Sequence, residues 1–262
     1  MPEFVIFTLA GPMASFGTVA GNERRGTESR PGHSILVGLL AAALGMRRTE
    51  AAPLAALSDA CQFAVRLDRP GVLMTDYHTV QSARRNKKID AVATRREMLL
   101  EGDRTTILTR REYLMDVQFT VAVAFTHATI TPATLVEALR RPGFALYLGR
   151  KSCPPSLPLN PILIADAQAG EDAFERYDLV TLGRAGCLWG SCSRSGRERP
   201  RSTGPEIALD VRLGTSASSH RRERRRVRPV DRGTWRFDPL DELVVSAPRQ
   251  QRAGSDDDTR ET

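Results

Sequence analysis

The residues of this sequence with the clearest chemical potential are basic, and they are concentrated between Arg84 and Arg111. This stretch holds nine lysines and arginines but only four acidic residues, a net charge of +5 over 28 residues. The basic residues are Arg84, Arg85, Lys87, Lys88, Arg95, Arg96, Arg104, Arg110 and Arg111. Because strand-like sequence stands on both sides, the stretch is a basic excursion between two strands. Such an arm suits contact with a phosphate backbone, although a solvated surface loop would have a similar composition.

A second basic segment lies at residues 194–236, with thirteen arginines and five acidic residues. It includes the run RRERRRVR at 221–228. We interpret this segment as either a second phosphate contact or a flexible basic segment. The whole chain of 262 residues has a formal net charge of +7 and a pI of about 9.7, which favours a polyanionic partner.

Motifs for other kinds of chemistry are missing from the sequence. It contains no phosphate-binding GxxxxGK[ST], no zinc-binding HExxH and no cluster of carboxylates for two metals. The cysteines are scattered and lack the spacing of a zinc site, so we expect reduced thiols, no metal and no cofactor. They are Cys61, Cys153, Cys187 and Cys192. With no apolar run of about 18 residues and no basic N-terminal segment typical of a secretion signal, we expect a cytoplasmic protein without a membrane span.

Hydrophobic patterns predict alternating strands and helices over the first 150 residues. Strands are expected at 3–9, 61–67, 117–125 and 144–148. The first strand is expected to end at Gly11-Pro12. Ser34 is expected to cap a buried helix, and Gly45 to take the left-handed position after its end. Thr131-Pro132 is typical of the start of a second helix.

The resulting order is strand, helix, strand, basic arm, strand, helix, strand, which is typical of a ferredoxin-like, RRM-like fold of the α+β class. We expect this domain at 1–154, with the basic arm forming a thumb hairpin at 77–112. Beyond it, β-like pieces predict a small β-rich domain at 155–246 that could form a second sheet. These pieces are 161–165, 178–182, 207–213 and 242–246. Residues 247–262 are predicted to be disordered.

Six segments of the sequence resemble one known family. They are LAGPMASFG (9–17), RGTESRPGHSILVGLLAAALG (25–45), QFAVR (62–66), DYHTV (76–80), RREYLMDVQFTVAV (110–123) and LYLGRKSCP (146–154). Together they are similar to the CasD family, a repeat-associated (RAMP) type of protein that holds the 5′ handle of the guide RNA in the type I-E CRISPR Cascade complex. The sequence departs from that family at His33, where a basic residue is usual, and at Gly26, where proline is common. The C-terminal third hardly matches the family.

The resemblance implies a ferredoxin-like body, a thumb hairpin and a small C-terminal β domain. It also implies a protein that caps one end of a filament of CasC subunits, lies beside the large subunit CasA and meets target DNA only indirectly, through the complex. RNA contacts are expected in three segments: the start of the buried helix, the thumb, and the Gly-rich loop after residue 146. The expected RNA-binding residues are Arg25, Arg30, Ser34, Arg84, Arg85, Lys87, Lys88, Arg110, Arg111, Tyr147, Gly149, Arg150, Lys151 and Ser152.

The chemistry of these residues agrees with contact to a bent single strand of RNA. Gly149 would let backbone N–H groups approach a phosphate, and Arg111 could fork to a phosphate or stack on a base. Tyr147 could stack on a base or be a core tyrosine at a strand end. We expect Arg111 and the loop from Tyr147 to Lys151 to form one handle-binding site.

The resemblance implies a binding protein, because another subunit, CasE, cuts the guide RNA in this subtype. The alternative is a metal-independent endoribonuclease, since a related subunit of a sister subtype cleaves the guide precursor. That chemistry needs a general base and a general acid, and His33, Tyr147 and Lys151 could converge. His78 is interpreted as a structural hydrogen-bonding residue. A free-standing basic RNA chaperone would fit the composition but would not explain the six segments.

Overall fold

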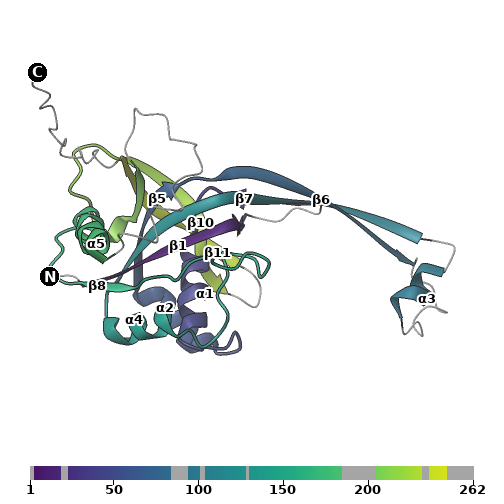
Figure 1. Cartoon of the computed structure of the whole chain (residues 1–262), viewed down its shortest axis with the longest axis horizontal. Helices are drawn as coiled ribbons and strands as arrows, with labels where there is room; N and C mark the ends of the chain where they lie inside the picture. The colour runs from purple at the N-terminus through teal and green to yellow at the C-terminus, as the bar shows by residue number, and fades with distance from the viewer. Residues whose placement is uncertain are drawn as a thin grey trace, which may run out of the picture.

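A large β-sheet with a long projecting hairpin dominates the computed structural model of the chain (Figure 1). The structure describes residues 3–18, 23–83, 94–100, 104–127, 130–184, 205–231 and 236–246. The strands are β1 (Phe4–Ala14), β2 (Phe16–Gly17), β3 (Arg24–Arg25), β4 (Thr27–Glu28), β5 (Cys61–Arg69), β6 (Val72–Ala83), β7 (Arg104–Phe125), β8 (Ile162–Ile164), β9 (Glu206–Asp210), β10 (Arg221–Asp231) and β11 (Arg236–Ser246). The helices are α1 (His33–Ala43), α2 (Ala51–Ala60), α3 (Arg95–Leu100), α4 (Pro132–Arg140) and α5 (Gly170–Arg184), with a short 3-10 turn, η1, at Val211–Leu213.

The main sheet has the strand order β10-β11-β9-β5-β7-β1-β8, with β3 and β6 also pairing to β7. Strand β7 pairs antiparallel with both β1 and β5, and β1 pairs antiparallel with β8. The chain is therefore an α+β protein with a mostly antiparallel sheet. Strands expected at 3–9, 61–67 and 117–125 are confirmed as β1, β5 and part of β7.

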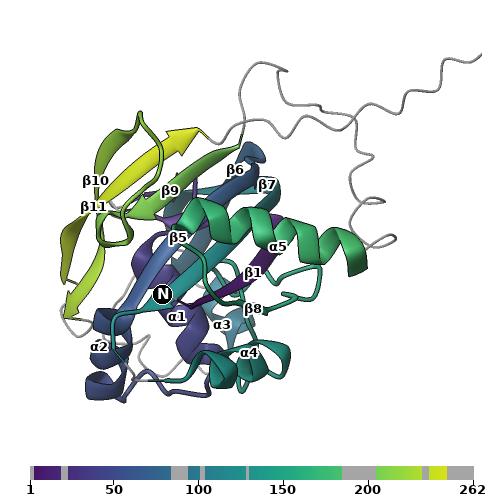
Figure 2. The same ribbon diagram turned by 90° about the vertical axis from the view of Figure 1, so that its left-hand side faces the viewer.

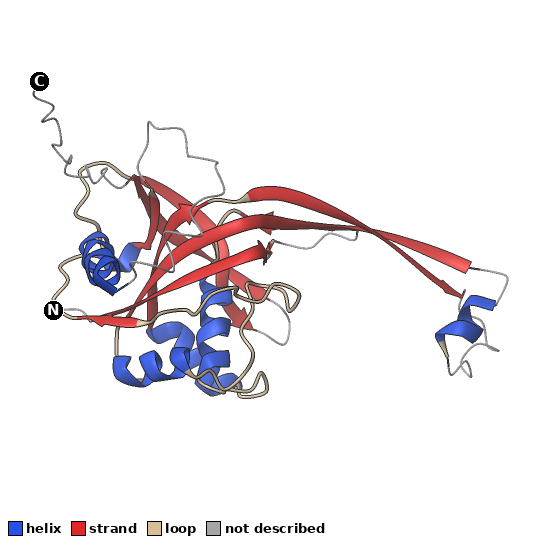
Figure 3. Cartoon of the chain, in the orientation of Figure 1, coloured by secondary structure: helices blue, strands red, loops and turns tan. Residues whose placement is uncertain are grey.

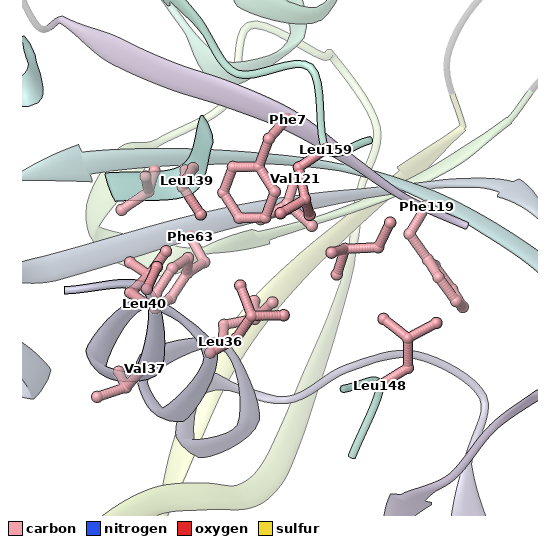
Figure 4. Close-up of a cluster of buried hydrophobic side chains, with 14 of the residues drawn as sticks. Phe7, Leu36, Val37, Leu40, Phe63, Phe119, Val121, Leu139, Leu148 and Leu159 are labelled. Atoms are coloured by element: carbon pink, nitrogen blue, oxygen red, sulfur yellow. The ribbon is translucent and has the colours of Figure 1, made fainter. Parts of the chain in front are cut away.

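Helices cover both faces of the sheet (Figure 2). On one face, α1, α2 and α4 bury the larger core, in which Leu36 and Leu40 of α1 lie near Phe63 of β5 (Figure 4). On the other face, α5 buries a second core that includes Ala64. Because neighbouring residues of a strand point to opposite faces, Phe63 and Ala64 are each buried in a different layer.

The sequence predicted the C-terminal end of α1 correctly but not its N-terminal cap. Gly45 has a φ of +74°, and the N–H groups of Gly45 and Met46 donate to Ala42 and Ala41, the hydrogen bonds of a Schellman motif. The prediction that Ser34 caps the helix is wrong: Gly32 is the N-cap residue, and no side chain caps it. For α4 the expected cap is confirmed, since the Thr131 side chain accepts a hydrogen bond from the Thr134 N–H.

One predicted strand end and one predicted strand are wrong. Strand β1 continues through Gly11-Pro12 to Ala14, and its register skips Pro12, which has no N–H to donate. The segment 144–148 is not a strand. Its start runs across the end of α1 instead, where the N–H groups of Gly143 and Phe144 donate to the carbonyls of Ala43 and Ala42. The bond from Gly143 gives a partner to a carbonyl in the last turn of the helix, and the bond from Phe144 adds a second donor to the Ala42 carbonyl, which also accepts from Gly45.

The C-terminal strands extend the main sheet and do not form a second one. Strand β9 pairs with β5, β11 with β9, and β10 with β11. The strand predicted at 178–182 is wrong, because residues 170–184 form α5. Ala173, Phe174 and Tyr177 bury one side of that helix, a helical spacing that the β-like run DLVTL obscures. The basic run at 221–228 belongs to β10 and is neither a loop nor part of a separate sheet.

The basic arm is a long two-stranded ribbon that projects from the body (Figures 1 and 3). It consists of β6 and β7, paired from Val72 with Met115 to Ala83 with Arg104, and α3 lies near its tip. Of the predicted thumb at 77–112, residues 77–83 and 104–112 lie in the paired strands of this hairpin. Arg84, Arg85, Lys87 and Lys88 lie outside the described residues, as do Cys187, Cys192 and residues 247–262.

Candidate RNA-binding site

The base of the hairpin carries a third strand on its other edge. Strand β3 runs parallel to β7, with Arg24 beside Arg110 and Arg25 beside Arg111. The Arg110 N–H donates to the Glu23 carbonyl over 2.8 Å. Because side chains alternate along a strand and register partners share a face, Arg25 and Arg111 lie on one face while Arg24 and Arg110 lie on the other. Both Arg110 and Arg111 are expected RNA contacts, but the alternation of side chains along β7 places them on opposite faces.

The face that carries Arg24 is partly neutralised. The Arg24 Nε donates to Glu112 Oε1 over 2.7 Å, and the Thr27 N–H donates to Glu112 Oε2 over 3.3 Å. The hydrogen bond from Arg24 lowers the pKa of Glu112, which keeps this buried carboxyl group ionised. On the opposite face, Arg25 and Arg111 make no ion pair within the described part of the chain. That face therefore has two basic side chains available for a ligand, whereas on the face of Arg24 the exposed Arg110 is the one without an ion pair among the described residues.

Arg150 joins this available face from a distant loop. Its guanidinium carbon lies 4.8 Å from the centre of the Tyr113 ring, and Nη2 donates to the Arg25 carbonyl over 3.2 Å. Tyr113 is two residues after Arg111 on β7 and so shares its face. Arg150 Nη1 is buried without a hydrogen-bond partner. Three arginines from three segments, Arg25, Arg111 and Arg150, are thus brought to one face at the base of the hairpin; we call them the arginine triad.

The loop from Tyr147 to Ser152 is held against the body by its own backbone. The Ser15 N–H donates to the Leu148 carbonyl over 3.0 Å, and the Leu148 N–H donates to the Cys153 carbonyl over 2.7 Å. Gly149 has a φ of +88°, and a Cβ there would lie 1.9 Å from the Ser15 carbonyl oxygen. Glycine is therefore required at this position by packing against Ser15, a reason that the sequence did not reveal.

Beside this loop lies a groove of about 620 Å³ with an apolar floor and a basic rim. Predicted residues that line it are Ser34, Tyr147, Gly149 and Lys151. Further lining residues include Arg47, Arg48, Phe144, Pro229 and Phe237. Tyr147 is 39% exposed, so it is not a core tyrosine. The exposed pair Arg47-Arg48 was missed because it follows the end of α1, where basic residues are often simple complements to the helix dipole.

Arg30 does not belong to this surface, contrary to the sequence expectation. It is only 6% exposed. Its Nη2 donates to Glu242 Oε2 and Glu223 Oε2 over 2.6 Å each, and Nη1 lies 3.6 Å from Glu206. Arg225 Nη2 also donates to the Arg30 carbonyl over 3.2 Å. The acidic residues of β9, β10 and β11 therefore take up this charge and fix the segment that leads from β4 into α1.

The acid–base set of the nuclease alternative is not assembled. His33 is buried against Phe63, and its Nε2 lies 3.0 Å from the Ser58 carbonyl oxygen. Burial lowers its pKa to about 4. His33 borders a small internal cavity, whereas Tyr147 and Lys151 line the groove. His33 therefore does not share a pocket with Tyr147 and Lys151, as a general base and a general acid would need to.

The expectation for His78 can be placed in the structure. His78 hydrogen-bonds to Asp76 on β6, in agreement with a structural role. Within the described ranges, no group of three or more His, Cys, Asp or Glu side chains could hold a metal ion. No helix among those residues is long and apolar enough to cross a membrane.

Comparison with known proteins identifies the family. A family model described as CRISPR-associated protein (Cas_Cas5) matches residues 4–238. The chain therefore belongs to the Cas5 family of CRISPR-associated proteins.

Individual relatives agree with this assignment. The CRISPR system Cascade subunit CasD of Escherichia coli (strain K12) is 41% identical over 170 residues, which cover 61% of this chain and 70% of that protein. A chain in a structure titled CRISPR RNA-guided surveillance complex has a TM-score of 0.59 and 28% identity, with 93% of this chain and 89% of that chain covered. A structure titled Crystal structure of Cas protein has a TM-score of 0.52 and 26% identity, with 94% and 95% covered. The resemblance to the CasD family is confirmed.

Proposed function

We propose that this protein is the CasD-type subunit of a type I-E Cascade complex and binds the 5′ handle of the guide RNA without cutting it. In this role it would cap a filament of CasC subunits beside CasA in the cytoplasm and contact target DNA only through the complex. The observation that carries the proposal is the arginine triad next to the groove. Arg25, Arg111 and Arg150 come from three distant segments, yet they share one surface.

The order of the strands supports a ferredoxin-like body as the platform for this surface. The four strands that follow the expected strand and helix order are β1, β5, β7 and β8, and they lie side by side as β8-β1-β7-β5 with antiparallel pairing throughout. In this arrangement β7 is central, so the hairpin that extends it is rooted in the core. A rooted hairpin can hold Arg111 at a fixed place relative to the loop that carries Arg150.

The loop that carries Arg150 connects the triad to the groove. Arg150 points to Tyr113 and Arg25, whereas its neighbours Gly149 and Lys151 line the groove with Tyr147. A bent single strand could therefore place phosphates on the triad and a base against Tyr147 in the groove. Ser152 is exposed at the end of the same loop, close to both parts. We include it, with Ser34 at the groove, among the proposed contacts.

The test is to assemble the complex by co-expression and to identify the RNA that the protein retains. We expect guide RNAs with a uniform 5′ end, with less RNA retained in the Arg111→Ala and Tyr147→Ala variants. The purified protein alone, incubated with labelled repeat RNA, should leave that RNA intact. Cleavage at one position that is lost in a His33→Ala variant would replace the proposal with the endoribonuclease alternative. Assembly without RNA would also overturn it.

A further inference from the structure

The basic run at 221–228 forms a regular row of arginines on an edge strand. Strand β10 is the last strand of the sheet and pairs only with β11 among the described strands. Its side chains alternate between two sides. Toward α1, Arg225 binds Glu242, and Val227 packs against Gly32. On the other side lie Arg222, Arg224 and Arg226, which we call the β10 row.

The β10 row keeps an excess of positive charge. Asp241 of β11 is shared by Arg222, whose Nη2 lies 2.6 Å from Oδ2, and by Arg224, whose Nε lies 2.8 Å from Oδ1. The hydrogen bonds from Arg224 and Arg222 lower the pKa of Asp241. Arg226 is exposed and makes no ion pair with any described residue. One carboxylate therefore faces three guanidinium groups, and the side chains of Arg222 and Arg224 are 63% and 72% exposed.

The spacing of the row suits a polymer of phosphates better than a single small anion. Alternate residues of an antiparallel strand are about 6.8 Å apart, which is close to the separation of neighbouring phosphates along an extended nucleic acid strand. Arginine forks to phosphate oxygens in a way that a lone lysine cannot. A row of three arginines at constant spacing can therefore follow a backbone through successive nucleotides.

The row also leads to the groove of the candidate RNA-binding site. Pro229 is three residues after Arg226, and it pairs with Phe237 of β11. Both Pro229 and Phe237 line the groove, together with Tyr147 and Lys151. A single strand that leaves the groove at this end reaches β10 on the side of α1, and it meets the row after passing around the outer edge of β10, the last of the described strands in the sheet.

We propose that Arg222, Arg224 and Arg226 bind the phosphate backbone of single-stranded RNA and so extend the path of the strand held in the groove. This inference rests on the proposed function, because it takes the occupant of the groove to be guide RNA. Of the two interpretations of the basic segment, it favours the phosphate contact for residues 221–228.

The test measures the affinity of the full chain for a labelled oligouridylate at several salt concentrations. Arg224→Gln/Arg226→Gln should bind about tenfold more weakly at low salt, and the slope of log affinity against log salt should shrink by about 1.4, or about 0.7 per lost contact. The matched control is Arg140→Gln/Arg176→Gln, which removes the same charge from α4 and α5. Like Arg224, Arg176 has a carboxylate partner, Asp172. The control should bind within about twofold of the unmodified protein, because its charges lie away from the row.

Asp241→Asn should change the affinity for RNA in the opposite direction, and a loss of folding cannot produce such a gain. Removing this carboxylate frees Arg222 and Arg224, so the affinity for the oligouridylate should rise about threefold. Asp172→Asn adds the same charge on α5 and should not raise it. Equal losses in the two double arginine variants, or unchanged or weaker binding by Asp241→Asn, would overturn the proposal. A loss seen with duplex DNA but not with RNA would overturn it in favour of a duplex contact.

Failure of the row and failure of the proposed function give different results. If Tyr147→Ala and Arg111→Ala bind RNA weakly while the row variants bind it normally, the row is not a contact and the proposed function stands. If the row variants lose affinity and Tyr147→Ala and Arg111→Ala do not, the row binds RNA but the groove does not hold the handle.

Discussion

The guanidinium carbon of Arg150 lies 4.8 Å above the ring of Tyr113, and this contact joins two segments that are far apart in the sequence. Tyr113 belongs to the root of the hairpin, and Arg150 belongs to the loop that lines the groove. The same arginine donates a hydrogen bond to the Arg25 carbonyl. Arg150 therefore fixes the relative position of the three segments that the proposed RNA site requires.

Replacing the ring beneath Arg150 should weaken RNA binding even if Tyr113 does not touch RNA. Tyr113→Leu removes the cation–π contact, which is worth about 1 kcal/mol at this partly buried site, and lets the guanidinium move. We expect a two- to fivefold loss of affinity for repeat RNA, measured by fluorescence anisotropy. Tyr113→Phe retains the ring and should bind like the unmodified protein. If Tyr113→Leu and Tyr113→Phe behave alike, Arg150 is not positioned by the ring.

The substitution Gly149→Ala should destabilise the fold. A β-carbon at this position meets the Ser15 carbonyl oxygen, and the positive φ disfavours alanine as well. We expect a loss of about 3 kcal/mol in the free energy of unfolding, measured by chemical denaturation. Gly38→Ala is the control, because the helix α1 offers open space there, and it should stabilise by about 0.5–1 kcal/mol. Equal stability of the two variants would refute the packing role of Gly149.

The substitution Glu242→Gln should destabilise the protein by leaving Arg30 under-neutralised in the interior. Breaking a buried ion pair from one side costs about 3 kcal/mol or more, and Glu223 and Glu206 offset only part of that charge. The control is Glu137→Gln in the exposed pair with Arg141, which should change stability by less than about 0.5 kcal/mol. Both are measured as midpoints of urea unfolding. A shift as small for Glu242→Gln as for Glu137→Gln would contradict this account of Arg30.

Stability should fall between pH 7 and pH 5 because His33 resists protonation in the folded state. Burial lowers the pKa of His33 to about 4, whereas an unfolded histidine has a pKa of about 6.5. Below about pH 6.5 the unfolded chain binds the proton more readily, so stability is lost as the pH falls. At 1.36 kcal/mol per pKa unit, the loss at pH 5 is about 2 kcal/mol. His33→Gln should flatten this dependence; an equally steep decline in that variant would exclude His33 as its source.

Local sequence patterns predicted the strands and caps that depend on neighbouring residues. The alternation in 61–67 and the Thr131-Pro132 start were sufficient because each acts through residues a few positions away. The patterns failed where distant segments compete for the same hydrogen bonds. The segment 144–148 looks like a strand, but carbonyls at the end of α1 accept hydrogen bonds from the N–H groups of Gly143 and Phe144.

The candidate site was predictable as a set of segments but not as a set of side chains. The segments near Arg25, Arg111 and Arg150 do come together. However, the register that sets Arg25 beside Arg111, and the acidic partners that bury Arg30, depend on pairing between strands far apart in the chain. Arg47 follows the end of α1, and only the tertiary fold brings it to the groove that contains Tyr147.

The most direct test of the shared surface is a double-mutant cycle on Arg25 and Arg111, read as the affinity for repeat RNA. The two residues are register partners on one face, so each alanine substitution should cost about 1 kcal/mol, and the losses should fall short of additivity by about 0.5 kcal/mol or more. Arg110 lies next to Arg111 in sequence but on the opposite face, so Arg25→Ala combined with Arg110→Ala should be additive. Additive losses for Arg25 with Arg111, or equal coupling of Arg25 to Arg110, would contradict the account.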